Sequence, residues 1–273
     1  MDSCDKVFIG SDDGVWFRMS KYLHRFQKID DRSYNSLIYN YLWFSSPFDF
    51  NDPYDCNIEL DYENNTLQEI EKFGREVNEG INRFSEEGLL ERVNYIANNP
   101  KEISQLMRKQ DKDNLSEIGI CCFSEKDDSL LMWSHYSDSH KGICLSFDFE
   151  EDKVFFTTPY CVEYPEKYPV INFINDRKSL RPWRILIATK SKEWKYEQEI
   201  RIVKDERKPP CKQNIEFKKK ALSSIKFGYK SLEIEQIKIK SILEKVGGYE
   251  HVKFYKAKLK RFEFGMEYEE ILI

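Results

Sequence analysis

The sequence predicts an α+β protein built as one domain with an inserted helical layer. Two kinds of segment support this fold class. Residues 118–123 and 142–149 are continuous apolar runs of the buried-strand type, whereas residues 62–112 place apolar side chains at helical spacing. No internal repeat or low-complexity linker interrupts the 273 residues. We therefore expect a single domain over residues 1–273, with the helical insertion at about 62–115.

Local patterns predict the order of the elements along the chain. Aromatic residues at 15–19 indicate a strand, Ser33 is placed to cap a helix running to Tyr41, and Pro47 ends a strand over 42–46. Two or three amphipathic helices follow within 62–112. The remainder is rich in strands, expected at 118–123, 142–149, 155–164, 199–203, 215–217, 225–227 and 252–262, with helices at 129–136, 176–189 and 232–246.

The composition limits the class of protein. Hydrophobic residues make up 40%, charged residues 33% and aromatic residues 15% of the chain, which indicates a soluble globular protein with a packed core and excludes disorder. The 43 Lys+Arg and 48 Asp+Glu leave a formal net charge of -5, which argues against a generic nucleic-acid coat. No apolar run approaches the ~20 residues of a membrane helix, and the acidic N-terminus lacks a signal-peptide core. We expect no membrane partner.

The cysteines do not suggest a disulfide framework. There are seven of them, an odd number, and no pair has the C-x-x-C spacing of a zinc ribbon or a thioredoxin-like motif. They are interpreted as reduced, mostly buried thiols, which predicts a cytoplasmic protein.

The first block with chemical potential is LWFSSPFDFNDPYD, residues 42–55. Asn51, Asp52 and Pro53 form a strong turn signal, because Asn and Asp side chains bond to their own backbone and Pro fixes φ. One interpretation is a structural turn beneath a cluster of phenylalanines. The other is a loop at the end of a strand that points the Asn51 amide and the Asp52 carboxylate at a ligand.

The second block is CFSEKDDSLLMWSHYSDSHKG, residues 122–142. It holds two of the four histidines, His135 and His140, together with Trp133 and Tyr136. A zinc site lacks a third ligand at suitable spacing, so we predict no metal. Two interpretations stay open: a connecting helix whose rings pack, or a ligand pocket with stacking rings and hydrogen-bonding imidazoles.

The third block is KSKEWKYEQEIRIV, residues 190–203. Alternate residues of an extended strand face the same side, so we expect Glu197, Glu199 and Arg201 to share one face. Two carboxylates this close raise each other's pKa unless a cation such as Arg201 offsets the repulsion. An ordinary solvated strand face with an ion pair is the alternative. Common hydrolase, kinase and dehydrogenase signatures are absent from the sequence.

Together the three blocks resemble a widespread bacterial family of uncharacterised domains. Its members carry, in order, a short aromatic and basic strand, L-W-F-S-x-P-x-x-F-N-D-P, C-F-S-E…M-W-x-H-Y…H-K-G, and W-x-Y-E-x-E-x-R. This sequence has all four between Trp16 and Arg201.

The layout also resembles the ADP-ribosyltransferase superfamily, whose split β-sheet core carries its motifs on three strands. In that pattern an Arg or His on the first strand holds the dinucleotide, a serine-bearing strand follows, and a late strand carries E-x-E. The resemblance implies Arg18 as the first-strand residue, Ser124 as the serine, and Glu199 as the catalytic glutamate, preceded by Glu197. It assigns no role to the histidine block.

The resemblance implies an NAD-consuming ADP-ribosyltransferase-like enzyme, with NAD as its substrate and an unknown protein or nucleic acid as acceptor. A toxin or antiviral-defence role, and a regulatory partner protein, follow only by analogy. The expected catalytic residues are Glu199, Glu197, His135 and Tyr136, and the expected NAD-binding residues are Arg18, Ser124, Trp133, His140, Asn51 and Asp52. The alternatives are a nucleic-acid-processing enzyme that uses the His and Glu residues, and a catalytically inactive nucleotide- or peptide-binding module.

Overall fold

Contacts within the chain divide it into two units. The computed structural model describes residues 6–10, 16–157, 159–176, 182–205 and 214–272. Unit 1 is made of Met1–Ser45, Ile118–Val162 and Glu193–Ile273, and unit 2 of Ser46–Glu117 and Glu163–Lys192. The helical insertion expected at 62–115 lies inside unit 2.

An eight-stranded, mostly antiparallel sheet forms the centre of unit 1. Its strands lie in the order β14-β13-β12-β7-β3-β6-β10-β8, and the one parallel pair among them is β12 and β13. A parallel pair needs a crossover connection, which helix α8 (Glu233–Val246) provides. The strands are β3 (Tyr22–Gln27), β6 (Ile118–Ser124), β7 (Ile143–Asp148), β8 (Pro159–Cys161), β10 (Glu199–Asp205), β12 (Leu222–Phe227), β13 (Lys253–Leu259) and β14 (Met266–Glu270).

The two faces of this sheet differ in polarity. On one face, Leu23, Phe123 and Phe147 belong to the main core, together with side chains of α1 (Asp31–Ile38) and α8. On the other face, Met132 and Trp133 of helix α5 (Leu130–Tyr136) pack against strand residues such as Phe26 and Cys144. Successive strand residues point to opposite faces, so this second face also receives the polar residues that alternate with the main core.

Shorter elements complete unit 1. Strands β1 (Lys6–Gly10) and β2 (Trp16–Ser20) pair with each other outside the large sheet, and β4 (Tyr41–Trp43) pairs with β11 (Asn214–Glu216). Short 3-10 helices occur at η3 (Phe149–Asp152), η5 (Lys219–Ala221) and η4 (Lys192–Glu197), the last of which begins at the final residue of unit 2.

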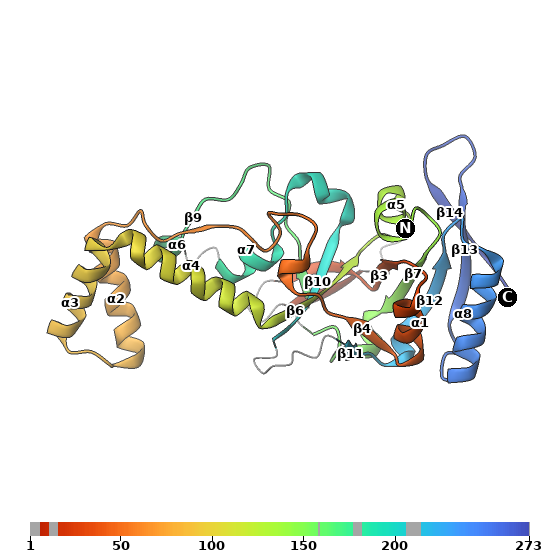
Figure 1. Ribbon diagram of the computed structural model, residues 1–273, viewed down its shortest axis with the longest axis horizontal. Coiled ribbons are helices and arrows are strands. Elements are labelled where there is room, and N and C mark those ends of the chain that lie inside the picture. Colours follow the sequence, from red (N-terminus) through yellow and green to blue (C-terminus); the bar gives the residue numbers. More distant parts are fainter. Residues whose placement is uncertain (1–5, 11–15, 158, 177–181, 206–213, 273) are drawn as a thin grey trace. The chain divides into compact units, whose positions relative to one another are not determined.

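Unit 2 is dominated by the three helices α2 (Leu67–Ile81), α3 (Glu86–Asn98) and α4 (Pro100–Ser116) (Figure 1). Thr66 caps α2 in a reciprocal capping box with Glu69, and Ser85 caps α3, so both helices begin at residues whose oxygens accept orphan backbone N–H groups. Ile70, Leu89 and Val93 form their own apolar cluster. The other elements are η2 (Pro47–Asp49), β5 (Leu60–Asp61), β9 (Ile171–Asn172), α6 (Phe173–Asp176) and α7 (Pro182–Ala188).

Several local predictions are confirmed and others are wrong. The α+β class and the buried strands β6 and β7 are confirmed, and the two or three helices expected within 62–112 are observed as α2, α3 and α4, the last of which extends to Ser116. The helix expected from Ser33 to Tyr41 instead begins after the cap residue Asp30 and ends at Ile38, because Asp30 accepts from the Ser33 backbone and Ser33 completes the capping box from inside the helix. The strand expected at 155–164 shrinks to the three residues of β8.

Other expectations lie partly outside the described residues. The structure does not describe Val15 of the first predicted strand, but the rest of that strand is observed as β2. It likewise does not describe residues 177–181 of the helix predicted at 176–189, whose later part is observed as α7. Within the part of the chain that the structure describes, no helix is both long and apolar enough to cross a bilayer.

Cys121 and Cys144 are buried thiols. Burial raises the pKa of both thiols, and that of Cys121 reaches about 11.

Candidate functional site

A row of polar side chains crosses four adjacent strands of the large sheet in unit 1. In the strand register, Glu199 on β10 stands opposite Ser124 on β6, Ser124 opposite His24 on β3, and His24 opposite Ser146 on β7. Residues directly opposite each other in antiparallel strands project from the same face. All four are buried, with Glu199 5% and His24 7% exposed. Because buried polar groups need partners, the contacts of this row indicate what the site can do.

Glu199 is held by Arg201, two residues further along β10. The Arg201 Nε donates to Glu199 Oε1 at 2.8 Å and its Nη2 donates to Oε2 at 3.1 Å. The guanidinium is 0% exposed, so the carboxylate and the guanidinium neutralise each other away from water. Such a bidentate pair fixes the orientation of the carboxylate and provides a positive charge beside it. The predicted shared face of Glu199 and Arg201 is thus confirmed.

Glu197 lies close to this row but is not part of the strand. It is the last residue of η4, and Gln198 has a left-handed φ of 43° before β10 begins at Glu199. The expectation that Glu197 shares a strand face with Glu199 is therefore wrong, because the backbone turns between them. Its side chain accepts a 2.6 Å hydrogen bond from the Tyr136 hydroxyl, and its carbonyl accepts one of 2.6 Å from Ser124 Oγ. These bonds tie α5, η4 and β6 together.

The other end of the row is connected to a buried lysine. His24 Nδ1 lies 2.9 Å from Ser146 Oγ, and Lys226 Nζ donates to that same oxygen at 2.6 Å. Lys226 also forms an ion pair with Asp127 at 2.8 Å. A lysine ammonium can only donate hydrogen bonds, so the Ser146 oxygen accepts from Lys226. The Ser146 O–H remains available and can donate a hydrogen bond to His24 Nδ1. The ring Nε2 then carries the hydrogen.

The environment of His24 keeps its imidazole neutral at physiological pH. Burial, and then the positive charge of Lys226, lower the pKa of His24 from 6.5 to about 4. Burial alone would raise the pKa of Asp127, but the charge of Lys226, and that of His24 once it is protonated at the low pH where Asp127 titrates, hold it below its ordinary value. The row therefore presents a neutral hydrogen-bonding imidazole at His24, and the Asp127 carboxylate that pairs with Lys226 stays ionised beside it.

The residues of the histidine block take different positions. Trp133 is fully buried, donates from Nε1 to the Asp127 carbonyl at 2.8 Å, and packs edge-on against Phe26. His135 is exposed, with its ring 6.2 Å from that of Tyr196. His140 is half-buried at a left-handed φ of 70°, and its ring lies 5.2 Å from that of Tyr229. Burial, followed by the charge of Lys230, lowers the pKa of His140.

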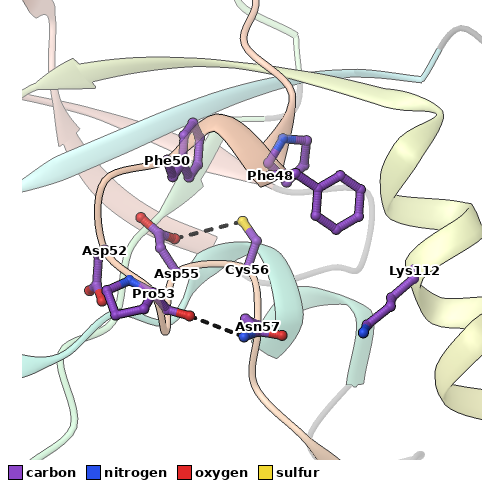
Figure 2. Close-up of a pocket in the computed structure, with 9 residues that line it drawn as sticks. Phe48, Phe50, Asp52, Pro53, Asp55, Cys56, Asn57 and Lys112 are labelled. Atoms are coloured by element: carbon purple, nitrogen blue, oxygen red, sulfur yellow. Dashed lines mark hydrogen bonds between the residues drawn. The ribbon is translucent and has the colours of Figure 1, made fainter.

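The remaining predicted NAD-binding residues are Arg18, Asn51 and Asp52. Arg18 belongs to β2, where its backbone pairs with Phe8 in the separate two-stranded sheet, and its side chain lies outside the described part of the structure. Asn51 is exposed and Asp52 is buried in unit 2. Asp52 lines a cavity in that unit (Figure 2).

Sequence reasoning missed His24, Ser146, Lys226 and Asp127. The stretch YLHRFQ that forms β3 has polar residues at half its positions, so it does not match the apolar pattern of a central strand. The available signal was its alternation, in which Tyr22, His24 and Phe26 share one face. Lys226 and Ser146 lie inside predicted strands, but the sequence does not show which strands pair. Their proximity to His24 therefore could not be predicted.

Comparisons with known proteins give one partial match. The family model described as "Protein of unknown function (DUF2971)" matches residues 132–202. This segment holds the M-W-S-H-Y…H-K-G and W-K-Y-E-Q-E-I-R blocks, which is consistent with the expected family of uncharacterised domains. No curated protein and no solved structure matches the chain.

The row and its neighbours combine hydrogen-bonding groups with one carboxylate held by a guanidinium. Hydroxyl groups from Ser124 and Ser146, a neutral imidazole and a fixed carboxylate lie along one short stretch of sheet, and the Tyr136 hydroxyl of α5 bonds to the neighbouring Glu197. Hydroxyl-rich ligands match such a mixture of donors and acceptors, and a preorganised carboxylate stabilises positive charge that develops during a reaction. No group of three or more His, Cys, Asp or Glu side chains suited to a metal ion is found among the described residues.

Proposed function

We propose that unit 1 is an NAD-consuming ADP-ribosyltransferase-like enzyme. The observation that supports it best is the strand register: His24, Ser124 and Glu199 stand opposite one another on three adjacent strands, β3, β6 and β10. The superfamily that the sequence resembles carries an Arg or His, a Ser and a Glu on three strands in that chain order. In this proposal His24 takes the first position in place of Arg18, because β3 belongs to the large sheet and β2 does not.

The proposed reaction breaks the bond between the nicotinamide nitrogen and the ribose C1′ of NAD. Nicotinamide leaves with the bonding electron pair, and the ribose ring acquires oxocarbenium character. The Glu199 carboxylate, paired with and oriented by Arg201, stabilises this positive charge through a ribose hydroxyl. An acceptor then attacks C1′ and gives its proton to Glu197, whose carboxylate is already oriented by Tyr136.

The neutral His24 suits a binding role in this scheme. An imidazole with a pKa of about 4 does not titrate near neutral pH, so its remaining ring N–H donates to a ribose or phosphate oxygen without a change of charge. Every member of the row is buried, and α5 packs on the same face of the sheet through Trp133 and Phe26. Access for NAD therefore requires a local opening of unit 1 above the row.

The direct test is to incubate the purified protein with NAD, and with cell protein or nucleic acid as acceptor, and to measure released nicotinamide by mass spectrometry. We expect Glu199→Gln to slow release by about 10²–10³-fold, the usual effect of removing one preorganised electrostatic contact. Glu267→Gln is the matched control, since it makes the same change at an exposed position on β14 of the same unit and should retain the parent rate.

Stability has to be measured alongside activity. Glu199→Gln removes the ionised Glu199 carboxylate from its buried pair with Arg201, which costs on the order of 3 kcal/mol. Rates are therefore compared at a temperature where both variants are shown to be folded by circular dichroism. Parent protein that releases no nicotinamide with either acceptor would refute the proposal in favour of a binding module. A Glu199→Gln variant as fast as the parent would refute the catalytic role of Glu199.

A further inference from the structure

The buried ammonium of Lys226 has two polar partners in unit 1, one on a strand and one in a loop. Lys226 is 8% exposed, and its Nζ lies 2.6 Å from Ser146 Oγ and 2.8 Å from Asp127 Oδ2. The ring centroids of Tyr255 and Tyr268 lie 6.0 and 5.5 Å from the same nitrogen. A buried charge is tolerated when it is paired and hydrogen-bonded, so these neighbours hold the ammonium in one position.

The loop residue Asp127 is itself held through its backbone. Its carbonyl oxygen accepts a 2.8 Å hydrogen bond from Trp133 Nε1 of α5 and another from the Tyr268 hydroxyl of β14. Asp127 lies between β6 and α5 and belongs to neither element, so these two bonds determine where its carboxylate meets Lys226. The buried Trp133 of the histidine block therefore does more than pack.

The hydrogen of the Ser146 hydroxyl has one acceptor within reach. Ser146 is 2% exposed, and its Oγ contacts Lys226 Nζ and, at 2.9 Å, His24 Nδ1. Among the described residues, no other acceptor lies within hydrogen-bond distance of this hydroxyl. Because Lys226 donates to the Ser146 oxygen, the hydroxyl donates to Nδ1. A hydrogen on Nδ1 would instead leave the Ser146 hydrogen buried without a partner, which is costly.

The second ring nitrogen of His24 is left for a ligand. No described residue forms a hydrogen bond with Nε2, and this atom is not among the buried polar atoms that lack a partner. The bond made by one imidazole nitrogen determines which nitrogen carries the hydrogen. We infer that Lys226 is a positioning residue, which acts through the Ser146 hydroxyl to keep His24 as an Nε2–H donor. The matching ligand atom is an acceptor, such as a ribose or phosphate oxygen of NAD, and this second part rests on the proposed function.

NMR of histidine-labelled protein without NAD tests the positioning role, because the chemical shifts of imidazole nitrogens distinguish a bare nitrogen from an N–H. Spectra are recorded at mildly alkaline pH, where the ring is neutral, and His24→Asn assigns the His24 signals. We expect parent His24 to carry its hydrogen on Nε2. Lys226→Met frees the Ser146 oxygen to accept from Nδ1–H, so the ratio of tautomers should shift about 10-fold toward Nδ1–H. Parent His24 with its hydrogen on Nδ1, or a parent-like ratio in Lys226→Met, would overturn the inference.

Three variants, each shown to be folded by circular dichroism, separate this effect from a loss of charge. Lys226→Arg keeps a charged group that only donates, so it should retain the parent tautomer. Lys226→Met/Asp127→Asn leaves no bare buried carboxylate and should shift the ratio as Lys226→Met does. Lys256→Met is the matched control, because Lys256 is a half-buried lysine of β13 that donates to Ser231 Oγ at 2.6 Å. A change of the His24 tautomer in Lys256→Met as large as in Lys226→Met would overturn the inference.

The affinity for NAD tests the ligand part of the inference. Lys226→Met should bind NAD about 2- to 10-fold more weakly than the parent, because only molecules with a hydrogen on Nε2 can donate to the ligand. Lys256→Met should bind as the parent does. Equal affinity of Lys226→Met and the parent would overturn the contact between His24 and NAD. Parent protein that binds no NAD would refute the proposed function, whereas the tautomers measured without NAD still decide the role of Lys226.

Discussion

The protonation of His24 makes a quantitative prediction about acid stability. His24 is buried in the polar row, where it faces Ser146, the ammonium of Lys226 and the carboxylate of Asp127. Burial and Lys226 lower its pKa from 6.5 to about 4. In the unfolded chain the same imidazole has its ordinary pKa. Between these two values the unfolded state binds a proton that the folded state does not.

The sign and size of the effect follow from this difference. As the pH falls below about 6.5, the unfolded state gains the proton first, so the free energy of unfolding decreases. The decrease ends near pH 4, where folded His24 is protonated as well. Each unit of pKa difference is worth about 1.4 kcal/mol, so His24 should account for a loss of about 3 kcal/mol across this window. Asp127, whose pKa is lowered below the ordinary carboxylate range, loses its contribution only at lower pH.

Urea unfolding at several pH values between 4 and 7 measures this effect. His24→Asn keeps a hydrogen-bonding group near Ser146 Oγ but cannot titrate, so its free energy of unfolding should fall less than that of the parent, by about 3 kcal/mol over the window. His251→Asn makes the same substitution at an exposed histidine of unit 1 and is the matched control. The reasoning is refuted if His24→Asn and the parent show the same pH dependence.

Two further predictions concern stability alone. A Cβ added at Gly228 would lie 2.1 Å from the His140 carbonyl oxygen, so Gly228→Ala should lower the free energy of unfolding by about 1–3 kcal/mol. A Cβ added at Gly80 in α2 meets no atom within 4 Å, so Gly80→Ala should raise the free energy of unfolding slightly. Thermal denaturation of both variants distinguishes the two signs. Asp55→Asn removes the partner charge of the buried Lys190 and should cost about 3 kcal/mol in urea unfolding. Asp55→Asn/Lys190→Met should recover part of that loss, and a double variant less stable than the single one would contradict the ion-pair explanation.

The parts of the fold that the sequence could predict are those determined by local pattern. Helices α2, α3 and α4 carry amphipathic spacing and cap residues such as Thr66 and Ser85, and β6 and β7 are apolar runs. The central strand β3 was missed because its buried face holds His24. The partners that make this burial tolerable are Ser146 and Lys226, and the nearer of them, Ser146, lies 122 residues away along the chain.

In the candidate site too, local motifs identified some residues, whereas features that depend on long-range contacts were missed. Ser124, Glu197 and Glu199 were chosen from short motifs, and the structure places Glu199 opposite Ser124 and bonds Ser124 to the Glu197 carbonyl. Local pattern could not show that the chain turns at Gln198, because a left-handed residue other than Gly or Asn has no clear sequence signature. It also gave no sign that Asp52 Oδ2 is buried without a donor.

The polar row also affects how the sheet can assemble. A slip of β3 by one residue against its neighbours would exchange its two faces, placing His24 in the apolar core and Leu23 among the hydroxyl and charged groups. The same slip in β10 would drive both Glu199 and Arg201 into the phenylalanine-rich side. Misaligned pairings are therefore penalised at several strands together, which makes the row a determinant of correct strand alignment during folding, whatever ligand it binds.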